Sequence, residues 1–165
     1  MTKKGYNHIV WLMVGVSVAF AMIVFLVFYL KSRSMKNAIN PVKGKITSRF
    51  GNRIAPTTGA STNHNGVDIS IPVGTPIVSP LDGRVLDINT HQTGGKQLII
   101  EHTNGYRTGY AHLSSYAVNK GDKVKQGQII AYSGNTGVST GPHLHFTLTN
   151  PMGIKINPED YFNFS

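Results

Sequence analysis

The segment Gly137-Val-Ser-Thr-Gly-Pro-His-Leu-His-Phe-Thr-Leu148 carries two histidines that are separated by one leucine. Its first six residues include two glycines and a proline, which is typical of a loop. From His143 onward, polar and apolar residues alternate, and this alternation predicts a β-strand. Successive side chains of a strand point to opposite faces, so His143 and His145 would project from the same side of a sheet.

A second group of polar residues lies upstream, in the segment His64-Asn-Gly-Val-Asp68. On a helix, His64 and Asp68 would lie one turn apart. Gly66 and the alternating apolar residues that follow it favour a loop that enters a strand instead. Either conformation brings the imidazole and the carboxylate to one place.

These residue types are suited to a metal site. Catalytic zinc takes imidazole and carboxylate ligands, three from the protein, and leaves a fourth position for water. His64, Asp68 and one of the two downstream histidines supply such a set. A single histidine is more commonly a core or surface residue, so the combination of the two motifs is what favours zinc. The chain has no cysteine, which excludes disulfides and thiolate ligands.

Length and charge limit the possible functions. A chain of 165 residues allows one domain of ordinary size and an appendage. The formal net charge of +9 is uneven, because five basic residues flank an apolar segment near the amino terminus. From Asn37 onward, the excess of basic over acidic residues is four, and no basic stretch is interleaved with aromatic residues. The sequence therefore does not predict nucleic-acid binding.

The apolar amino-terminal segment is predicted to anchor the chain in a membrane. Residues 9–30 carry no charge, and about twenty apolar residues cross a bilayer as a helix. Residues 1–8 would form a short cytoplasmic tail. The alternative is a signal peptide cleaved near Ala19-Phe-Ala21, but cleavage there would leave a strongly apolar new terminus. Basic residues flank both ends of the segment, so the positive-inside rule does not decide the orientation.

Residues 31–43 are polar and basic and predict a linker that reaches at most about 40 Å. Residues 44–165 then show short apolar runs between turn signals such as Asp82-Gly83, which predicts an all-β domain of the sandwich or barrel kind. The predicted strands are Lys45–Ser48, Val67–Ile71, Thr75–Val78, Arg84–Ile88, Gln97–His102, Tyr106–His112, Gln128–Tyr132 and His143–Thr149. The predicted core residues are Ile69, Ile71, Ile77, Val85, Ile88, Leu98, Ile100, Tyr110, Ile129, Ala131, Phe146 and Leu148.

From about Ile46 to Tyr161, the chain resembles the lysostaphin-type (LytM-type) zinc endopeptidases of bacterial cell walls. The resemblance rests on His64–Ile69, Gly74–Pro76, Tyr110–Leu113, Val124 with Gly127 and Gln128, and Ser139–Phe146. It implies a β-rich domain with an open groove, one Zn²⁺ per domain and a peptidoglycan peptide as substrate. It also implies His64, Asp68 and His145 as zinc ligands, with His112 and His143 beside the metal as catalytic histidines.

In an enzyme of this kind, zinc would polarise the scissile carbonyl and acidify a bound water molecule. One of His112 and His143 would accept the proton, and the other would stabilise the developing oxyanion. The sequence leaves open which histidine has which role. Because the substrate lies outside the cytoplasm, the resemblance implies a domain on the periplasmic or cell-wall side of the cytoplasmic membrane.

Two alternatives to a membrane-anchored endopeptidase remain from the sequence. The first is a noncatalytic, membrane-tethered scaffold or activator of another wall enzyme, against which stands the complete set of zinc ligands. The second is a wall-binding module, but such grooves usually display stacked aromatic residues, and Trp11 lies in the apolar segment. The sequence does not specify whether the cleaved bond would lie in a glycine bridge, a crosslink between D-amino acids or a stem peptide.

Overall fold

The computed structural model describes residues 13–27, 34–56, 58, 61–103 and 105–165. The chain divides into two compact units, Met1–Met35 and Lys36–Ser165. In the first unit, residues 13–27 form an α-helix whose residues are all exposed. No helix among the described residues is both long and apolar enough to cross a membrane. The predicted span over residues 9–30 includes 9–12 and 28–30, which lie outside the described residues, as do the predicted tail and residues 31–33 of the predicted linker.

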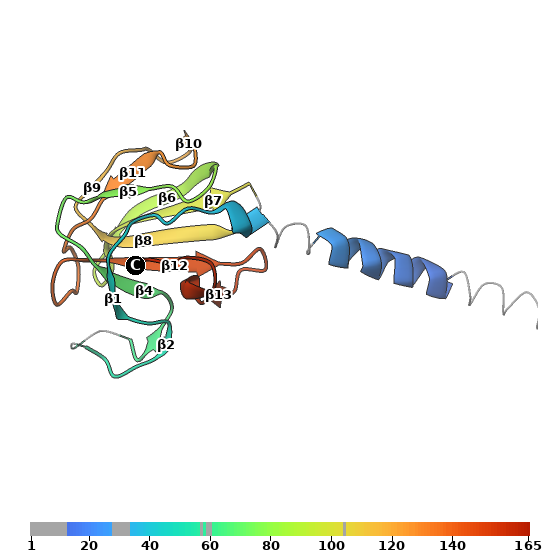
Figure 1. The fold of residues 1–165 in the computed structure, drawn as a ribbon, viewed down its shortest axis with the longest axis horizontal. Coiled ribbons are helices and arrows are strands. Elements are labelled where there is room, and N and C mark those ends of the chain that lie inside the picture. Colours follow the sequence, from blue (N-terminus) through green and yellow to red (C-terminus); the bar gives the residue numbers. More distant parts are fainter. Residues whose placement is uncertain (1–12, 28–33, 57, 59–60, 104) are drawn as a thin grey trace, which may run out of the picture. The chain divides into compact units, whose positions relative to one another are not determined.

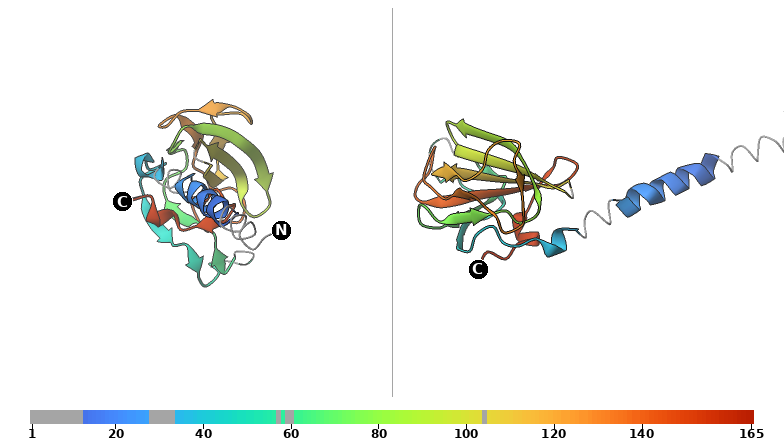
Figure 2. Two further views of the ribbon diagram at one scale, coloured as in Figure 1. Left: turned by 90° about the vertical axis from the view of Figure 1, so that its right-hand side faces the viewer. Right: turned by 90° about the horizontal axis from the view of Figure 1, so that it is seen from above.

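The second unit is built on a large antiparallel sheet with the strand order β1-β4-β12-β8-β7-β6-β10, and β13 also pairs with β12 (Figures 1 and 2). Its strands are β1 (Lys45–Ser48), β4 (Val67–Ser70), β6 (Gly83–His91), β7 (Gly95–His102), β8 (Arg107–Leu113), β10 (Lys123–Val124), β12 (His143–Thr149) and β13 (Lys155–Ile156). The prediction of a β-rich domain is confirmed.

Two smaller sheets and a short 3₁₀ helix complete this unit, and a second 3₁₀ helix spans the boundary between the two units. The strands of the first small sheet follow the order β5-β11-β9, and they are β5 (Pro76–Val78), β11 (Ile129–Tyr132) and β9 (Ser115–Tyr116). The second small sheet pairs β2 (Gly51–Asn52) with β3 (Asn63–His64). The 3₁₀ helices are η1 (Ser34–Asn37) and η2 (Pro158–Asp160).

Strand β12 lies between β4 and β8 and separates the core from the polar face of the sheet. Leu144, Phe146 and Leu148 have no exposed surface. Burying an apolar side chain of this size contributes about 1.5–3 kcal/mol to folding, so this apolar face determines the register of β12. The alternation then directs His143 and His145 to the opposite face, as the sequence predicted.

Ten of the predicted core residues are buried, and the predictions for Ile88 and Ile129 are wrong. Ile88 is partly exposed on β6, and the exposed fraction of Ile129 is 41%. Ile130 is fully buried instead. The register of β11 against β5 shifts between Ile129 and Ala131, and a bulge of this kind breaks the two-residue alternation on which the prediction depended.

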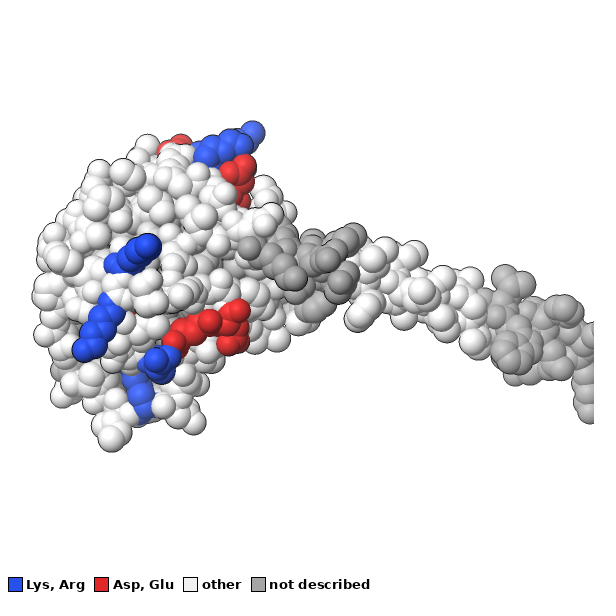
Figure 3. Space-filling view, in the orientation of Figure 1, with Lys and Arg blue, Asp and Glu red and all other residues white. Residues whose placement is uncertain are grey.

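The charged side chains of this unit are dispersed. On the face shown in Figure 3, lysine and arginine side chains lie at several places, and some lie beside acidic side chains. Several cations form ion pairs, including Lys120 with Asp87 and Lys125 with Asp82, both at 2.8 Å. Exposed pairs of this kind contribute little to stability, but they neutralise much of the local positive charge.

His102 is a buried histidine outside the predicted site. Its Nε2 lies 2.8 Å from the Thr108 hydroxyl, and its Nδ1 lies 3.3 Å from the Asp82 carbonyl oxygen. Burial lowers the pKa of His102 from 6.5 to about 4, although the hydrogen bond with the Asp82 carbonyl acts in the opposite direction. Because the pKa of His102 is lower in the folded chain, the unfolded chain binds a proton at pH values between about 4 and 6.5, whereas the folded chain does not.

We therefore expect the free energy of unfolding to fall as the pH falls from 6.5 to 4, with His102 responsible for about 3 kcal/mol of this loss. Above pH 6.5, His102 should have no effect on the pH dependence. Unfolding of the wild type and of His102→Gln, followed by circular dichroism at pH 7 and pH 4.5, tests this. The variant should lose clearly less stability than the wild type, and equal losses would contradict the prediction.

Candidate metal centre

The backbone brings the two sequence motifs together on neighbouring strands. Strands β4 and β12 are antiparallel, and Asp68 lies directly opposite His145. Opposite residues of such a pair have their Cβ atoms about 5 Å apart on one face. His64 ends β3, and Gly66 connects it to β4. A Cβ atom on Gly66 would lie 2.3 Å from the Phe146 carbonyl oxygen, so this close approach to β12 requires glycine.

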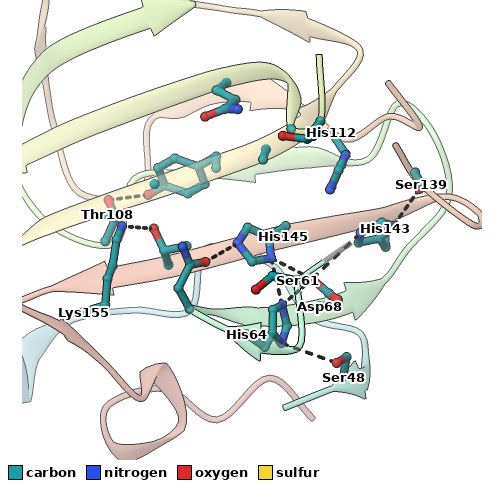
Figure 4. Close-up of a pocket in the computed structure, with 18 of the residues that line it drawn as sticks. Ser48, Ser61, His64, Asp68, Thr108, His112, Ser139, His143, His145 and Lys155 are labelled. Carbon is teal, nitrogen blue, oxygen red and sulfur yellow. Dashed lines mark hydrogen bonds and ion pairs between the residues drawn. The ribbon is translucent and has the colours of Figure 1, made fainter. Parts of the chain in front are cut away.

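His64, Asp68 and His145 form a compact cluster (Figure 4). Asp68 Oδ1 lies 2.8 Å from His145 Nδ1 and 3.1 Å from His64 Nε2. The two imidazole nitrogens are 3.0 Å apart. Ligands at about 2.1 Å from a tetrahedral zinc ion lie about 3.4 Å from one another, so three atoms at these separations can be bridged by one ion after a small adjustment.

In His64 and His145, the hydrogen bond of the outer nitrogen, the one that points away from the cluster, determines the tautomer. His64 Nδ1 lies 2.7 Å from the Arg49 carbonyl oxygen, and His145 Nε2 lies 3.1 Å from Asn65 Oδ1. Both partners are acceptors, so each outer nitrogen carries the proton and each inner nitrogen presents its lone pair to the cluster. Two lone pairs and a carboxylate oxygen within about 3 Å repel one another unless a cation lies among them. The donor set therefore fits a metal ion, with acceptors that orient both imidazoles.

Arg53 holds the other oxygen of Asp68. Arg53 Nη1 donates to Asp68 Oδ2 at 2.8 Å and to the Ser48 hydroxyl at 2.6 Å. Oδ1 is therefore left to face the two histidines. Without a cation, burial would raise the pKa of Asp68, but hydrogen bonds from inward N–H groups of His145 and His64 outweigh burial and lower it. A cation among the three residues would replace those protons and keep Asp68 ionised in the same way. Asp68 is consequently ionised in the form that binds a cation.

His143 precedes His145 by two residues on the same face of β12. His143 Nδ1 lies 2.8 Å from the Gly141 carbonyl oxygen and donates to it, and the Ser139 hydroxyl lies 3.1 Å away. This hydrogen bond turns Nε2 toward the cluster, 3.9 Å from Asp68 Oδ1. His143 is thus beside the three clustered residues, with its Nε2 directed at them.

His112 reaches the site through an unusual backbone conformation. On β8, Tyr110 is opposite the core residue Phe146, and strict alternation would place His112 on that core face as well. His112 has a φ of 60°, next to a register shift between β7 and β8. A non-glycine residue in this region is strained by about 1–3 kcal/mol. The conformation places the His112 ring 4.5 Å from that of His143, measured between centroids.

A hydrogen bond and burial also determine the state of His112. Its Nδ1 lies 2.7 Å from the Thr136 carbonyl oxygen, which leaves Nε2 as an acceptor. Burial lowers the pKa of His112, although the hydrogen bond with the Thr136 carbonyl acts in the opposite direction. The neutral imidazole is therefore favoured, which is the form that can accept a proton.

All five predicted site residues line one open groove with a volume of about 680 Å³. Ser139 also lines it, where its hydroxyl donates to the Gly141 carbonyl at 2.8 Å. His91 is exposed at the end of β6, and His102 is buried elsewhere, so neither residue lines the groove. His8 lies outside the described residues.

The sequence did not indicate the roles of Arg53 and Asn65. Asn65 is part of the His64–Asp68 motif, and its position next to the candidate ligand His64 is the one feature of the sequence that could have indicated its role. Arg53 precedes Asp68 by fifteen residues, and its contact with that carboxylate depends on the β2–β3 hairpin. No sequence spacing would have predicted this contact.

Comparison with known proteins identifies relatives of this domain. Residues 62–158 match the model of peptidase family M23. Peptidoglycan DD-endopeptidase ShyA of Vibrio cholerae is 46% identical over 107 residues, which are 64% of this chain and 25% of the relative. This chain thus spans about a quarter of the length of that relative.

Two solved structures are also similar. A zinc-containing peptidase from Vibrio cholerae superposes with a TM-score of 0.66 at 41% sequence identity, covering 74% of this chain and 39% of that one. The catalytic domain of the antimicrobial peptidase lysostaphin from Staphylococcus simulans gives a TM-score of 0.63 at 32% identity, covering 78% of this chain and 95% of that one. These matches confirm the resemblance to lysostaphin-type enzymes, and because the matched segment exceeds half of the sequence and contains all five groove histidine and aspartate residues, the chain belongs to peptidase family M23.

Proposed function

We propose that this chain is a zinc metalloendopeptidase that hydrolyses peptide bonds in peptidoglycan crosslinks or stem peptides. The observation that carries the proposal is the convergence of two imidazole lone pairs and one carboxylate oxygen in an open groove, with two further histidines directed at them. The Vibrio cholerae relative is a peptidoglycan DD-endopeptidase, which supports the substrate class.

In this proposal, His64 Nε2, His145 Nδ1 and Asp68 Oδ1 hold the zinc ion. When bound, zinc would polarise the scissile carbonyl and lower the pKa of a water molecule at its open position. The Arg49 carbonyl and the Asn65 side chain keep both imidazoles in the tautomers that donate electrons inward. Arg53 keeps one oxygen of Asp68 away from the metal.

His112 and His143 are the proposed catalytic residues. Each donates its Nδ1 proton to a backbone carbonyl, so each Nε2 can accept a proton from an attacking water molecule. Once protonated, an imidazole at this position can donate a hydrogen bond to the oxyanion of the tetrahedral intermediate. The 4.5 Å between the two ring centroids allows one histidine to accept the proton of the water molecule and the other, when it carries a proton on Nε2, to donate to the oxyanion.

We also propose that residues 9–30 anchor the chain in the bacterial cytoplasmic membrane, with residues 31–43 as a linker to a peptidase domain over residues 44–165. The support is the uncharged apolar sequence of residues 9–30. Because peptidoglycan lies outside the cytoplasm, residues 1–8 would be cytoplasmic. Added protease should therefore remove the carboxyl-terminal domain from spheroplasts, and a protected carboxyl terminus would reverse this orientation.

The test of the function uses the full 165-residue chain, purified in detergent and incubated with isolated peptidoglycan, with and without a chelator. We expect new peptide ends, identified by mass spectrometry, in the zinc-containing sample and none after chelation. The identity of these ends would name the cleaved bond. A zinc-loaded protein that leaves several types of peptidoglycan uncut would contradict the proposal and favour a noncatalytic scaffold or activator.

A further inference from the structure

Lys155 places a positive charge in the groove, at a distance from the metal cluster. It belongs to β13, which pairs with the end of β12, and it lies opposite Thr149. Its Nζ donates to the Thr147 hydroxyl at 2.9 Å, and both side chains line the groove that contains the five site residues. In Figure 4, Lys155 lies on the side of His145 that is opposite to His143.

The spacing along β12 relates Lys155 to the reaction site. Thr147 follows His145 by two residues on the same face of the strand, and two residues of a strand span about 7 Å. Suppose that an extended substrate lies along β12 with its scissile carbonyl at the cluster. A substrate group about two residues from the cleaved bond would then reach the ammonium of Lys155.

Lys155 differs from the other cations of the groove in its partners. Arg53 is paired with Asp68, and Arg107 is paired with Glu101 at 2.8 Å. Among the described residues, no carboxylate forms an ion pair with Lys155, whose bonded partner is the neutral hydroxyl of Thr147.

The surroundings of Lys155 favour an anion from outside the chain. The residue as a whole is exposed, yet desolvation of its ammonium end lowers the pKa of Lys155. An anion beside the ammonium would offset this desolvation. Gly109 lies opposite Thr147 on β8, and a Cβ atom there would lie 2.6 Å from the Thr147 hydroxyl. The absence of a side chain at Gly109 leaves room for a ligand atom beside that hydroxyl.

We propose that Lys155 binds a carboxylate of the substrate peptide and makes the protein prefer a peptide with a free carboxylate over the same peptide with a carboxamide. This proposal rests on the proposed peptidase function. Peptidoglycan peptides offer such a group either beside a crosslink or at a chain end. Both sources share one chemistry, a charge-assisted hydrogen bond between ammonium and carboxylate.

The test compares three crosslinked tetrapeptide dimers as substrates of the full, zinc-loaded chain. The first has free carboxylates, the second is amidated beside the crosslink, and the third is amidated at the chain end. We expect the wild type to cleave the first with a kcat/KM about tenfold above that of one amidated dimer, mainly through KM, because a charged hydrogen bond is lost. Which amidation matters identifies the source of the carboxylate.

The variants assign this preference to one side chain. Lys155→Met should cleave the free and amidated dimers equally, and Lys155→Arg should keep most of the preference. The matched control is Lys123→Met, which removes an exposed lysine on β10 outside the groove and should behave as the wild type. A wild-type preference that survives in Lys155→Met, or a wild type without any preference, would overturn the proposal.

Calorimetric titration separates this proposal from the proposed function. The same dimers are titrated into His143→Ala and into the double variant His143→Ala, Lys155→Met. Both variants should cleave the dimers at least about a hundredfold more slowly than the wild type, so that binding can be measured. If no dimer is cleaved by the wild type, the peptidase proposal fails. If His143→Ala binds the free-carboxylate dimer about tenfold more tightly than an amidated dimer, and this difference disappears with Lys155→Met, the result would still support a carboxylate site. Equal binding of all dimers would refute it.

Discussion

Alanine at His64, Asp68 or His145 is expected to reduce the zinc content of the purified full chain from about one ion per molecule to less than about a tenth of that. Each residue contributes one of three convergent donor atoms that lie within 2.8–3.1 Å of one another. The groups that orient them, such as the Arg49 carbonyl and Asn65, would remain but cannot replace a lost ligand. Two ligands and water hold zinc much more weakly than three.

Metal analysis by mass spectrometry after dialysis measures this loss directly. A second readout is the melting temperature, because a ligand that binds the folded state alone stabilises it. Chelation should lower the melting temperature of the wild type and leave that of the three variants unchanged. His91→Ala is the matched control, since His91 is an exposed histidine outside the cluster, and it should keep its zinc. Retention of a full zinc ion by any of the three variants would refute its role as a ligand.

Strand β12, which carries His143 and His145, was predictable because it is seven residues long and has one buried face. The predicted limits of β1 and β12 coincide with the structure. In β12, the apolar residues alternate over seven positions, and that length is sufficient to distinguish a two-residue period from a helical one. The strands β2, β3, β9, β10 and β13 have two residues each, too few to show any period, and they were missed. Lys155 belongs to one of these short strands.

Proximity within each of the two motifs also followed from local spacing, since His143 and His145 share a strand face and His64 precedes Asp68 closely. Contacts that depend on distant elements did not. Arg53 meets Asp68 through the β2–β3 hairpin, and His112 faces the groove because its backbone departs from strand geometry. A positive φ on a histidine depends on a register shift between strands, which no local pattern in the sequence encodes.

His112→Ala and His143→Ala are expected to keep their zinc and to lose turnover by a factor of about 10²–10⁴ each. Neither side chain supplies an atom to the metal cluster: His143 Nε2 lies 3.9 Å from Asp68 Oδ1, and the His112 ring centroid lies 6.2 Å from that of His145. Both are instead held by backbone carbonyls with Nε2 free to exchange a proton with a reacting group. Their loss should therefore affect kcat far more than metal content.

The measurements are the zinc content and kcat for cleavage of a crosslinked peptide dimer, with His91→Ala again as the control that removes a histidine elsewhere. If the two rings act on one water molecule and one oxyanion, the double variant should be little worse than either single variant, because residues that act as a unit are strongly non-additive. Wild-type kcat in one variant would remove that histidine from the chemistry. Equal zinc loss in these variants and in the ligand variants would mean that the division of the five residues into ligands and catalytic groups is wrong, since only a residue that holds the metal should lower metal content.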